Sequence, residues 1–314
     1  MTDRRGGLLA VHAHPDDETL STGALLAAWA DAGRPVTVVT CTRGERGEVI
    51  PPDLAHLASD PAALAAHRES ELAAALTALG VTDHVFLDAA DDAGHPAARY
   101  EDSGMVWLGP AQAGPGSTSV HAFARVPVEE AAARLAAVIR DRRPDVVVGY
   151  EPGGGYGHPD HVHAHRVMRA AVAAAAAPDP SGGAAGHRVP VLLWAALDVS
   201  ALRAGRTDLD DVPPAALRPE APDAPVPSAA VPPEHVRVRV DVSAVLGRVQ
   251  RAMAAHASQV QAVRTWRDRS ATLGCFALSN GVLQPILPSE AYVVDPEWIQ
   301  ERIAWPAHVS TGIA

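Results

Sequence analysis

Two short apolar runs, residues 7–11 and 145–150, each lead directly into a proline-bearing cluster of histidines and aspartates. The first cluster reads His-Ala-His-Pro-Asp-Asp-Glu over residues 12–18, and the second reads Tyr-Gly-His-Pro-Asp-His over residues 156–161. An apolar run that ends in polar side chains is typical of a buried strand that delivers a site. If the two strands are neighbours in one parallel sheet, both clusters lie at its carboxyl edge, where open α/β sheets bind their ligands.

Around these clusters, the first half of the chain alternates extended and helical patterns. Residues 60–80 predict a helix, because Asp60 can cap it, Pro61 can take its first position and Gly80 can end it. Residues 36–40 are rich in β-branched side chains and predict a strand. Another strand is expected at residues 84–87, and further helices at residues 21–33, 128–142 and 160–176, the last capped by Asp160. The alternation predicts an α/β fold with a Rossmann-like, mostly parallel sheet flanked by helices.

The second half is less regular. Strands are expected at residues 189–197, 236–241 and 291–294, and a helix over residues 242–263. Two segments predict loops: a long polar stretch at residues 88–119, and a Pro/Ala-rich excursion at about 208–233. We expect a catalytic core over residues 1–180, followed by residues 181–314, which complete the fold and add a smaller C-terminal capping subdomain.

Charge and cysteine content narrow the classes of partner. The formal net charge of −11 argues against nucleic acid and against an anionic membrane surface, and it leaves a small neutral or cationic ligand open. The two cysteines, Cys41 and Cys275, are far apart in sequence and favour a reducing compartment. No apolar run reaches the length of a membrane span, so we expect a cytoplasmic protein; the oligomeric state is not predicted. Lysine is absent, which excludes a lysine-based mechanism.

The two clusters carry the ligand types that zinc prefers. A catalytic zinc takes three imidazole or carboxylate ligands and keeps one position open, and His14, Asp17 and His161 can supply that set. Asp16 would then remain a free carboxylate beside the metal, which makes it the candidate general base.

The remaining polar side chains of the second cluster suggest complementary roles. His158, oriented by Asp160, is the candidate for stabilising an oxyanion and protonating a leaving amine. Tyr156 can add a hydroxyl donor at the same place. A rival arrangement uses helical spacing, with His161 and His165 binding zinc as a pair near His163, but no Glu follows His161 and Asp17 would be left without a role.

Both motifs resemble a known family. Residues 13–18 and 158–161 are similar to the zinc-dependent N-acetylglucosaminyl deacetylases of the PIG-L/LmbE-like superfamily. Within it, several stretches resemble the deacetylases of mycothiol biosynthesis, which act on N-acetylglucosaminyl-inositol: residues 12–18, 39–42, 47–50, 102–105 and 154–158. The resemblance covers residues 7 to about 175.

The resemblance implies roles for individual residues. It implies one zinc per subunit, with iron(II) as the alternative metal, on three ligands: His14, Asp17 and His161. It implies a general base, an acid and a group near the oxyanion: Asp16, His158 and Tyr156, respectively. It implies that Arg68 and Asp102 hold sugar or inositol hydroxyls and that Glu48 and Met105 line the pocket.

The resemblance also implies a function and two rivals. The leading hypothesis is metal-dependent hydrolysis of the acetamide of a small amino-sugar inositol substrate. The sister amidase that cleaves mycothiol conjugates typically carries a lysine just after the first cluster, where this chain has residues 19–22, and an Asp where this chain has Glu48. The other rival, a sugar-binding protein without turnover, does not explain the free carboxylate of Asp16.

Overall fold

The computed structural model describes residues 6–90, 99–109, 112–116, 119–179, 182–210, 212, 217–298 and 300–312. Two of the predicted loops, residues 88–119 and 208–233, therefore lie partly outside the described residues. None of the described helices is long and apolar enough to cross a membrane.

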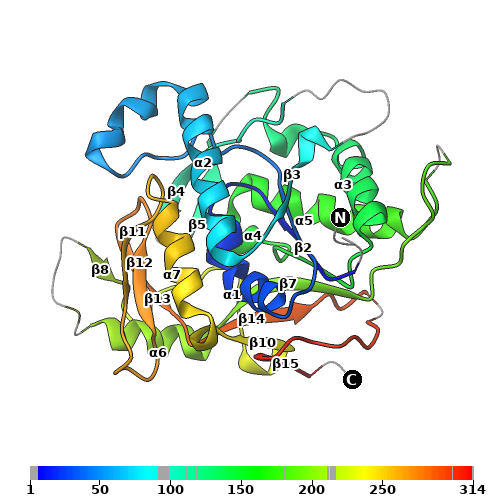
Figure 1. Ribbon diagram of the computed structural model, residues 1–314. Coiled ribbons are helices and arrows are strands. Elements are labelled where there is room, and N and C mark those ends of the chain that lie inside the picture. The colour runs from blue at the N-terminus through cyan, green and yellow to red at the C-terminus, as the bar shows by residue number, and fades with distance from the viewer. Residues whose placement is uncertain are drawn as a thin grey trace.

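A large, mostly parallel sheet forms the centre of the molecule (Figure 1). Its strands follow the order β15-β10-β14-β7-β6-β1-β2-β3. Five successive strands of this order are parallel: β3 (Asp83–Phe86), β2 (Val36–Thr40), β1 (Leu8–His12), β6 (Val146–Gly149) and β7 (Val191–Asp198). β1 pairs with β6 from Leu8 opposite Val146, so the two apolar runs are neighbours, as predicted.

Helices cover both faces of this sheet because its central strands are apolar on both sides. Alternate residues of a strand point to opposite faces, and Leu8 and Ala10 belong to one buried cluster whereas Leu9 and Val11 belong to another. The hydrophobic core that contains Leu8 and Ala10 also takes residues from α1 (Asp17–Asp31), α2 (Pro61–Leu79) and α7 (Leu246–Ala255). The hydrophobic core on the opposite face takes residues from α3 (Val128–Arg142) and α5 (Pro159–Ala175). This is the predicted Rossmann-like arrangement.

Local signals predicted the long helices well. Asp60 accepts hydrogen bonds from the N–H groups of Ala62 and Ala63 at the start of α2, and Gly80 ends the helix with a φ of 84°. α1 begins four residues earlier than expected, at Asp17, because two acidic residues in its first turn suit the positive end of the helix.

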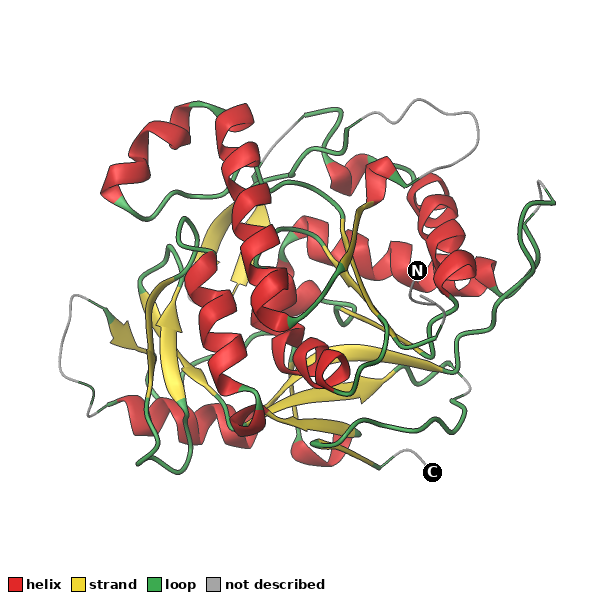
Figure 2. Ribbon diagram, in the orientation of Figure 1, coloured by secondary structure: helices red, strands yellow, loops and turns green. Residues whose placement is uncertain are grey.

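The second half extends the main sheet and adds a smaller one. β14 (Ser289–Val294) pairs antiparallel with β7, and β10 (Val238–Asp241) lies between β14 and β15 (Val309–Thr311). The smaller sheet contains β8 (Arg218–Pro219), β11 (Gln261–Thr265), β12 (Gly274–Ala277) and β13 (Val282–Ile286). In Figure 2 it stands at the left of the molecule next to α7, with α6 (Val199–Leu209) below it.

Two sequence expectations were wrong in this region and in the long loop. The predicted helix over residues 242–263 ends at Ala255, because the chain turns there to bond to α2 through Ser258 and then forms β11. The loop predicted at residues 88–119 contains a hairpin, β4 (Met105–Gly109) with β5 (Gln112–Pro115). The short elements α4 (Gly154–Gly157) and β9 (Ala230–Val231) were not predicted. The division of the chain near residue 180 stays a prediction.

Candidate metal centre and catalytic site

The carboxyl ends of β1 and β6 bring the two clusters together. The loop after β1 carries His14 and leads into α1, whose first residue is Asp17. The loop after β6 contains α4 and leads into α5, whose first turn carries His161. The sheet therefore brings together two side chains that are 147 residues apart in the sequence. His14 Nδ1 lies 3.2 Å from His161 Nε2, within hydrogen-bonding distance.

Three ligand atoms form a nearly equilateral triangle. His14 Nδ1 lies 3.3 Å from Asp17 Oδ2 and 3.2 Å from His161 Nε2, and His161 Nε2 lies 3.3 Å from Asp17 Oδ2. A tetrahedral zinc with bonds of about 2.0–2.1 Å holds its ligand atoms roughly 3.3–3.4 Å apart. The three side chains are 6 %, 7 % and 2 % exposed, respectively. One face of a tetrahedral metal therefore fits this triangle without movement.

The ring nitrogens that face away from the triangle are held by acceptors. His161 Nδ1 donates to the backbone oxygen of Gly154 at 3.1 Å, which leaves Nε2 as an acceptor for a metal. His14 Nε2 donates to Asp160 Oδ2 at 3.2 Å and lies 3.4 Å from Asp102 Oδ1. Metal-binding histidines are generally oriented in this way, by a carbonyl or a carboxylate on the other nitrogen.

The electrostatics of the triangle favour a cation. Although burial opposes it, Asp102, Asp160 and Asp17 raise the pKa of His14 well above its usual value. Burial acts to raise the pKa of Asp17, but His161 and His14 hold it well below its ordinary range. Three carboxylates thus surround one imidazole in a buried site, and a metal ion would compensate that excess of negative charge.

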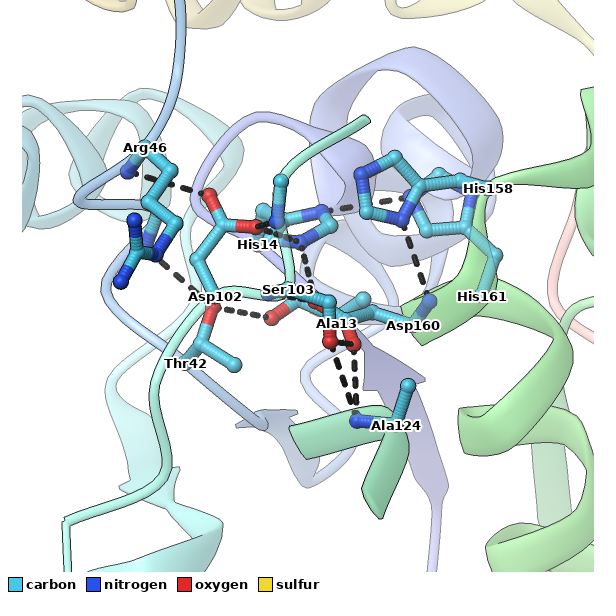
Figure 3. A network of polar contacts seen from close by, with 12 residues as sticks. Ala13, His14, Thr42, Arg46, Asp102, Ser103, Ala124, His158, Asp160 and His161 are labelled. Atoms are coloured by element: carbon cyan, nitrogen blue, oxygen red, sulfur yellow. Dashed lines mark hydrogen bonds and ion pairs between the residues drawn. The ribbon is translucent and has the colours of Figure 1, made fainter. Parts of the chain in front are cut away.

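Asp160 anchors the loop that carries Ser103 to the site (Figure 3). Its carboxylate accepts the N–H of Ser103 at 2.8 Å, the hydroxyl of Ser103, the N–H of Ala124 at 3.0 Å and the ring N–H of His14. The same loop presents Asp102 to His14. Asp160 is fully buried, and its carboxylate joins all of these hydrogen bonds.

Two expectations about Asp160 were wrong. The N-cap of α5 is His158, whose Nδ1 accepts the backbone N–H of Asp160 at 3.1 Å. Pro159 takes the first helical position, so Asp160 is the second residue of the helix and its side chain turns away from the cap toward His14 and Ser103. The backbone of Asp160, and not its carboxylate, therefore orients the His158 ring.

We expect Asp160→Asn to weaken metal binding about 10- to 100-fold, the usual cost of losing the carboxylate behind a metal-binding histidine. Competition between the protein and a zinc chelator measures the affinity. Asp295→Asn is the matched control, because Asp295 is equally buried and bonded to Arg169 and to the N–H of Glu297, at a distance from the triangle. Equal zinc affinity in the Asp160 variant and the wild type would contradict this role.

Asp16 lies beside the triangle but is not part of it. Its backbone has a φ of 119°, which residues other than glycine rarely adopt. Its Oδ2 accepts a hydrogen bond from Arg68 Nη2 at 3.2 Å, and its N–H donates to Glu18 Oε2 at 3.0 Å. Burial raises the pKa of Asp16 to about 6, although Arg68 acts to lower it. The geometry leaves this carboxylate available as a base.

His158 and Tyr156 surround the triangle with aromatic rings. The His158 ring packs edge-on against His14 with centroids 4.6 Å apart and stacks on His161 at 4.8 Å. Burial lowers the pKa of His158 well below its usual value. Tyr156 meets the His161 ring edge-on at 5.2 Å, and burial raises the pKa of its phenol.

Four residues near the site were missed by the sequence reasoning. Tyr150, the last residue of the second apolar run, stacks on His161 with centroids 4.3 Å apart, and its hydroxyl accepts the N–H of Ala13 at 2.8 Å. Its position directly after the strand was the only signal that could have revealed it. The others are Ser103, Glu18 and His256, and no sequence pattern connects His256 with the first cluster.

The residues expected to contact substrate lie around Asp16 and His14. Arg68 is buried, and its two terminal nitrogens bond to the backbone oxygens of Gly44 and Pro15 as well as to Asp16. Asp102 is also buried and accepts the N–H groups of Arg46 and Gly104.

The other two expected contacts are less enclosed. Glu48 is exposed, and Met105 is half-buried at the start of β4. Contact of Arg68, Asp102, Glu48 and Met105 with a substrate stays a prediction.

A cavity of about 300 Å³ opens beside the triangle. Asp16, Asp17, Tyr156 and His161 line it on the side of the triangle. Its other wall comes from the second half of the chain and is largely apolar, with Leu202, Phe276, Leu278, Ile286 and Leu287 among its members. Both halves of the chain are therefore needed to enclose a ligand at this site.

The rival metal pair does not form. His165 Nδ1 donates to the backbone oxygen of Tyr150 at 2.8 Å, and the ring lies edge-on to Trp194. His163 packs edge-on against Phe123. Among the described residues, the groups of His, Cys, Asp and Glu able to share a metal draw on His14, Asp102, His158, Asp160 and His161, and the triangle adds Asp17.

Comparison with known proteins identifies the family. The family model described as PIG-L, GlcNAc-PI de-N-acetylase, matches residues 9–172, more than half of the chain and both strand-end clusters. The chain belongs to the PIG-L family.

Individual relatives carry a narrower description. The 1D-myo-inositol 2-acetamido-2-deoxy-alpha-D-glucopyranoside deacetylase of Kineococcus radiotolerans is 46 % identical over 301 residues, covering 92 % of this chain and 77 % of that protein. The deacetylase of the same name from Streptomyces griseus is 46 % identical over 289 residues, covering 91 % and 82 %. Among solved structures, the 4-carboxy-2-hydroxymuconate hydratase of Pseudomonas putida has a TM-score of 0.53 at 17 % identity, over 95 % of this chain and all of that one, and supports the fold alone.

Proposed function

We propose that the protein is a zinc-dependent N-deacetylase of mycothiol biosynthesis. It hydrolyses the acetamide of N-acetylglucosaminyl-inositol, so that water and the amide give glucosaminyl-inositol and acetate. The observation that carries the chemistry is the triangle of His14, Asp17 and His161 with the uncommitted carboxylate of Asp16 beside it. The choice of substrate is supported by the names of relatives that are 41–46 % identical over most of the chain.

The triangle fits one zinc ion per subunit, and iron(II) is the alternative metal. When bound there, the ion supplies a Lewis acid that polarises a carbonyl and activates water at neutral pH. The two imidazoles and one carboxylate are the donor set of many catalytic zinc sites, and they leave one side free for substrate. Two of the three residues of the triangle, Asp17 and His161, also line the cavity.

Asp16 is the general base in this proposal. Arg68 holds its carboxylate from one side and Glu18 holds its backbone N–H from the other, so its orientation is fixed before substrate binds. A carboxylate held in this way can accept a proton and later return it. Asp16 takes a proton from the attacking water as the C–O bond forms.

His158 is assigned to the carbonyl oxygen. Its Nδ1 accepts the N–H of Asp160, so in the neutral ring the proton sits on Nε2 and can be donated to developing negative charge. A second proton on Nδ1 would disrupt that hydrogen bond. We therefore depart from the sequence-based expectation that His158 protonates the leaving amine. In this proposal that proton comes from Asp16, which has just received it from water. Tyr156, which lines the cavity beside the triangle, is the candidate for a second donor to the oxygen.

We expect kcat/KM for N-acetylglucosaminyl-inositol to exceed that for a mycothiol S-conjugate by at least about tenfold, roughly 1.4 kcal/mol of transition-state discrimination. Plain N-acetylglucosamine should be a poor substrate, because buried polar groups shaped for the inositol would lose their partners. Product analysis at one zinc per chain, with both substrates run side by side, measures the ratio. The Asp16→Asn variant controls for background hydrolysis.

Two results of this comparison would contradict the deacetylase proposal, and each would support one of the two alternative functions. Equal or faster turnover of the conjugate would identify an amidase, and the apolar wall of the cavity is the feature that would then accommodate the larger group. Binding of N-acetylglucosaminyl-inositol without acetate release from the zinc-loaded protein would identify a sugar-binding protein.

A further inference from the structure

The backbone of Asp16 needs external support. Its φ of 119° and ψ of −34° place it outside the conformations that non-glycine residues readily adopt. Such backbone strain persists only where the surrounding structure enforces it. The side chain points toward Arg68, and the backbone N–H points toward Glu18.

Glu18 supplies the support on the backbone side. Its Oε2 accepts the N–H of Asp16 at 3.0 Å, and its Oε1 accepts the hydroxyl of Thr19 at 2.6 Å. The same Oε1 lies 2.7 Å from Nε2 of His256. Glu18 and His256 are both fully buried, at 0 % exposure. His256 therefore fixes the carboxylate that in turn fixes the Asp16 backbone.

His256 reaches this position from the other end of the chain. It is the C-cap of α7, and its Nδ1 has no hydrogen-bond partner among the described residues, so Glu18 is the one hydrogen-bond partner of its side chain there. Two residues further on, Ser258 bonds to Glu71 of α2 through its N–H and its hydroxyl, each at 2.7 Å. α2 also carries Arg68, so the end of α7 is tied to both elements that hold Asp16.

We propose that Glu18 and His256 are positioning residues, which hold the Asp16 carboxylate in the orientation that proton transfer requires. This inference rests on the proposed function, in which Asp16 is the base. Without the His256 contact, Glu18 is a buried carboxylate lacking its imidazole partner and turns toward other donors, and the Asp16 backbone relaxes. A shift of about 1 Å in a catalytic group can lower the rate a hundredfold.

Two conservative variants separate positioning from bulk stability. His256→Gln places an amide N–H where Nε2 lies and keeps the donor to Glu18, whereas His256→Asn places it where Nδ1 lies and loses that donor. We expect His256→Asn to lower kcat by about 10- to 100-fold with KM and zinc content unchanged. We expect His256→Gln to recover at least half of that loss on a logarithmic scale. Ser258→Ala is the matched control, because it removes a buried side-chain contact that does not involve Glu18 and keeps the backbone N–H bond to Glu71 that ties this segment to α2.

A double-variant cycle with Asp16→Asn is the decisive measurement. If His256 acts through Asp16, adding His256→Asn to Asp16→Asn lowers kcat by less than about threefold further, because the base is already absent. If the two losses multiply, the inference is overturned, as it is if His256→Asn matches Ser258→Ala in kcat. Absence of deacetylase activity in the zinc-loaded wild type would instead refute the proposed function.

Discussion

Replacing His161 with alanine is expected to remove bound metal and deacetylase activity together. His161 Nε2 is one corner of the triangle and the only corner contributed by the second cluster; the other two, His14 Nδ1 and Asp17 Oδ2, come from the first. Two protein ligands hold a zinc ion far more weakly than three, so most of the affinity should be lost. Elemental analysis of the purified variant, together with acetate release, measures both effects.

His165→Ala is the matched control for this experiment. His165 lies one turn further along α5 and is buried to a similar degree, but its ring bonds to Tyr150 O, away from the triangle. It should keep its zinc and most of its activity. A full complement of zinc in His161→Ala, with loss of zinc from His165→Ala, would show that α5 binds the metal through His165 and not through His161.

The adjacent aspartates should separate catalysis from metal binding. Asp16→Asn is expected to retain zinc and to lower kcat by about 10²- to 10⁴-fold, the usual contribution of a positioned acid or base. The amide keeps an oxygen for Arg68 but cannot accept the proton of water. Asp17→Ala is expected to release the metal, because Oδ2 of Asp17 completes the triangle.

Zinc content and kcat, measured on both variants, decide between the two roles. The Asp17 variant also loses the acceptor for the N–H of His14, so its fold is checked by circular dichroism before its zinc content is interpreted. Loss of zinc from Asp16→Asn combined with retention in Asp17→Ala would exchange the assignments of base and ligand.

The sequence predicted the parts of the molecule that depend on local chemistry. The strand at Val146–Gly149 and the helix at Pro61–Leu79 follow from apolar runs, a capping Asp60 and a terminal Gly80. The meeting of the two clusters followed from one topological rule, that parallel strands deliver their loops to the same edge. The triangle therefore needed only that β1 and β6 be neighbours.

The parts that were missed depend on contacts between distant segments. The helix expected over residues 242–263 ends at Ala255, because the residues that follow form hydrogen bonds elsewhere: His256 with Glu18, and Ser258 with Glu71. Helix propensity depends on local sequence and cannot predict these contacts, because Glu71 lies 187 residues from Ser258 and Glu18 lies 238 residues from His256. For the same reason, nothing local indicated that the Asp160 carboxylate would turn to His14 and Ser103.

The second half of the chain contributes residues to the candidate site itself. It supplies His256, which contacts Glu18 next to Asp16, and the largely apolar wall of the cavity. The family model, in contrast, matches residues 9–172, the half that carries the triangle. The candidate metal ligands thus lie in the first half, and the shape of the cavity depends on both halves.

The central claim is that one metal ion in the triangle, with Asp16 beside it, hydrolyses the acetamide of N-acetylglucosaminyl-inositol. Its most direct test is acetate release from that substrate by metal-stripped protein titrated with zinc. The account predicts no release without metal, and a rate that rises with added zinc and levels off at one equivalent per chain. Acetate release from the stripped protein, or none at one equivalent of zinc, would contradict it.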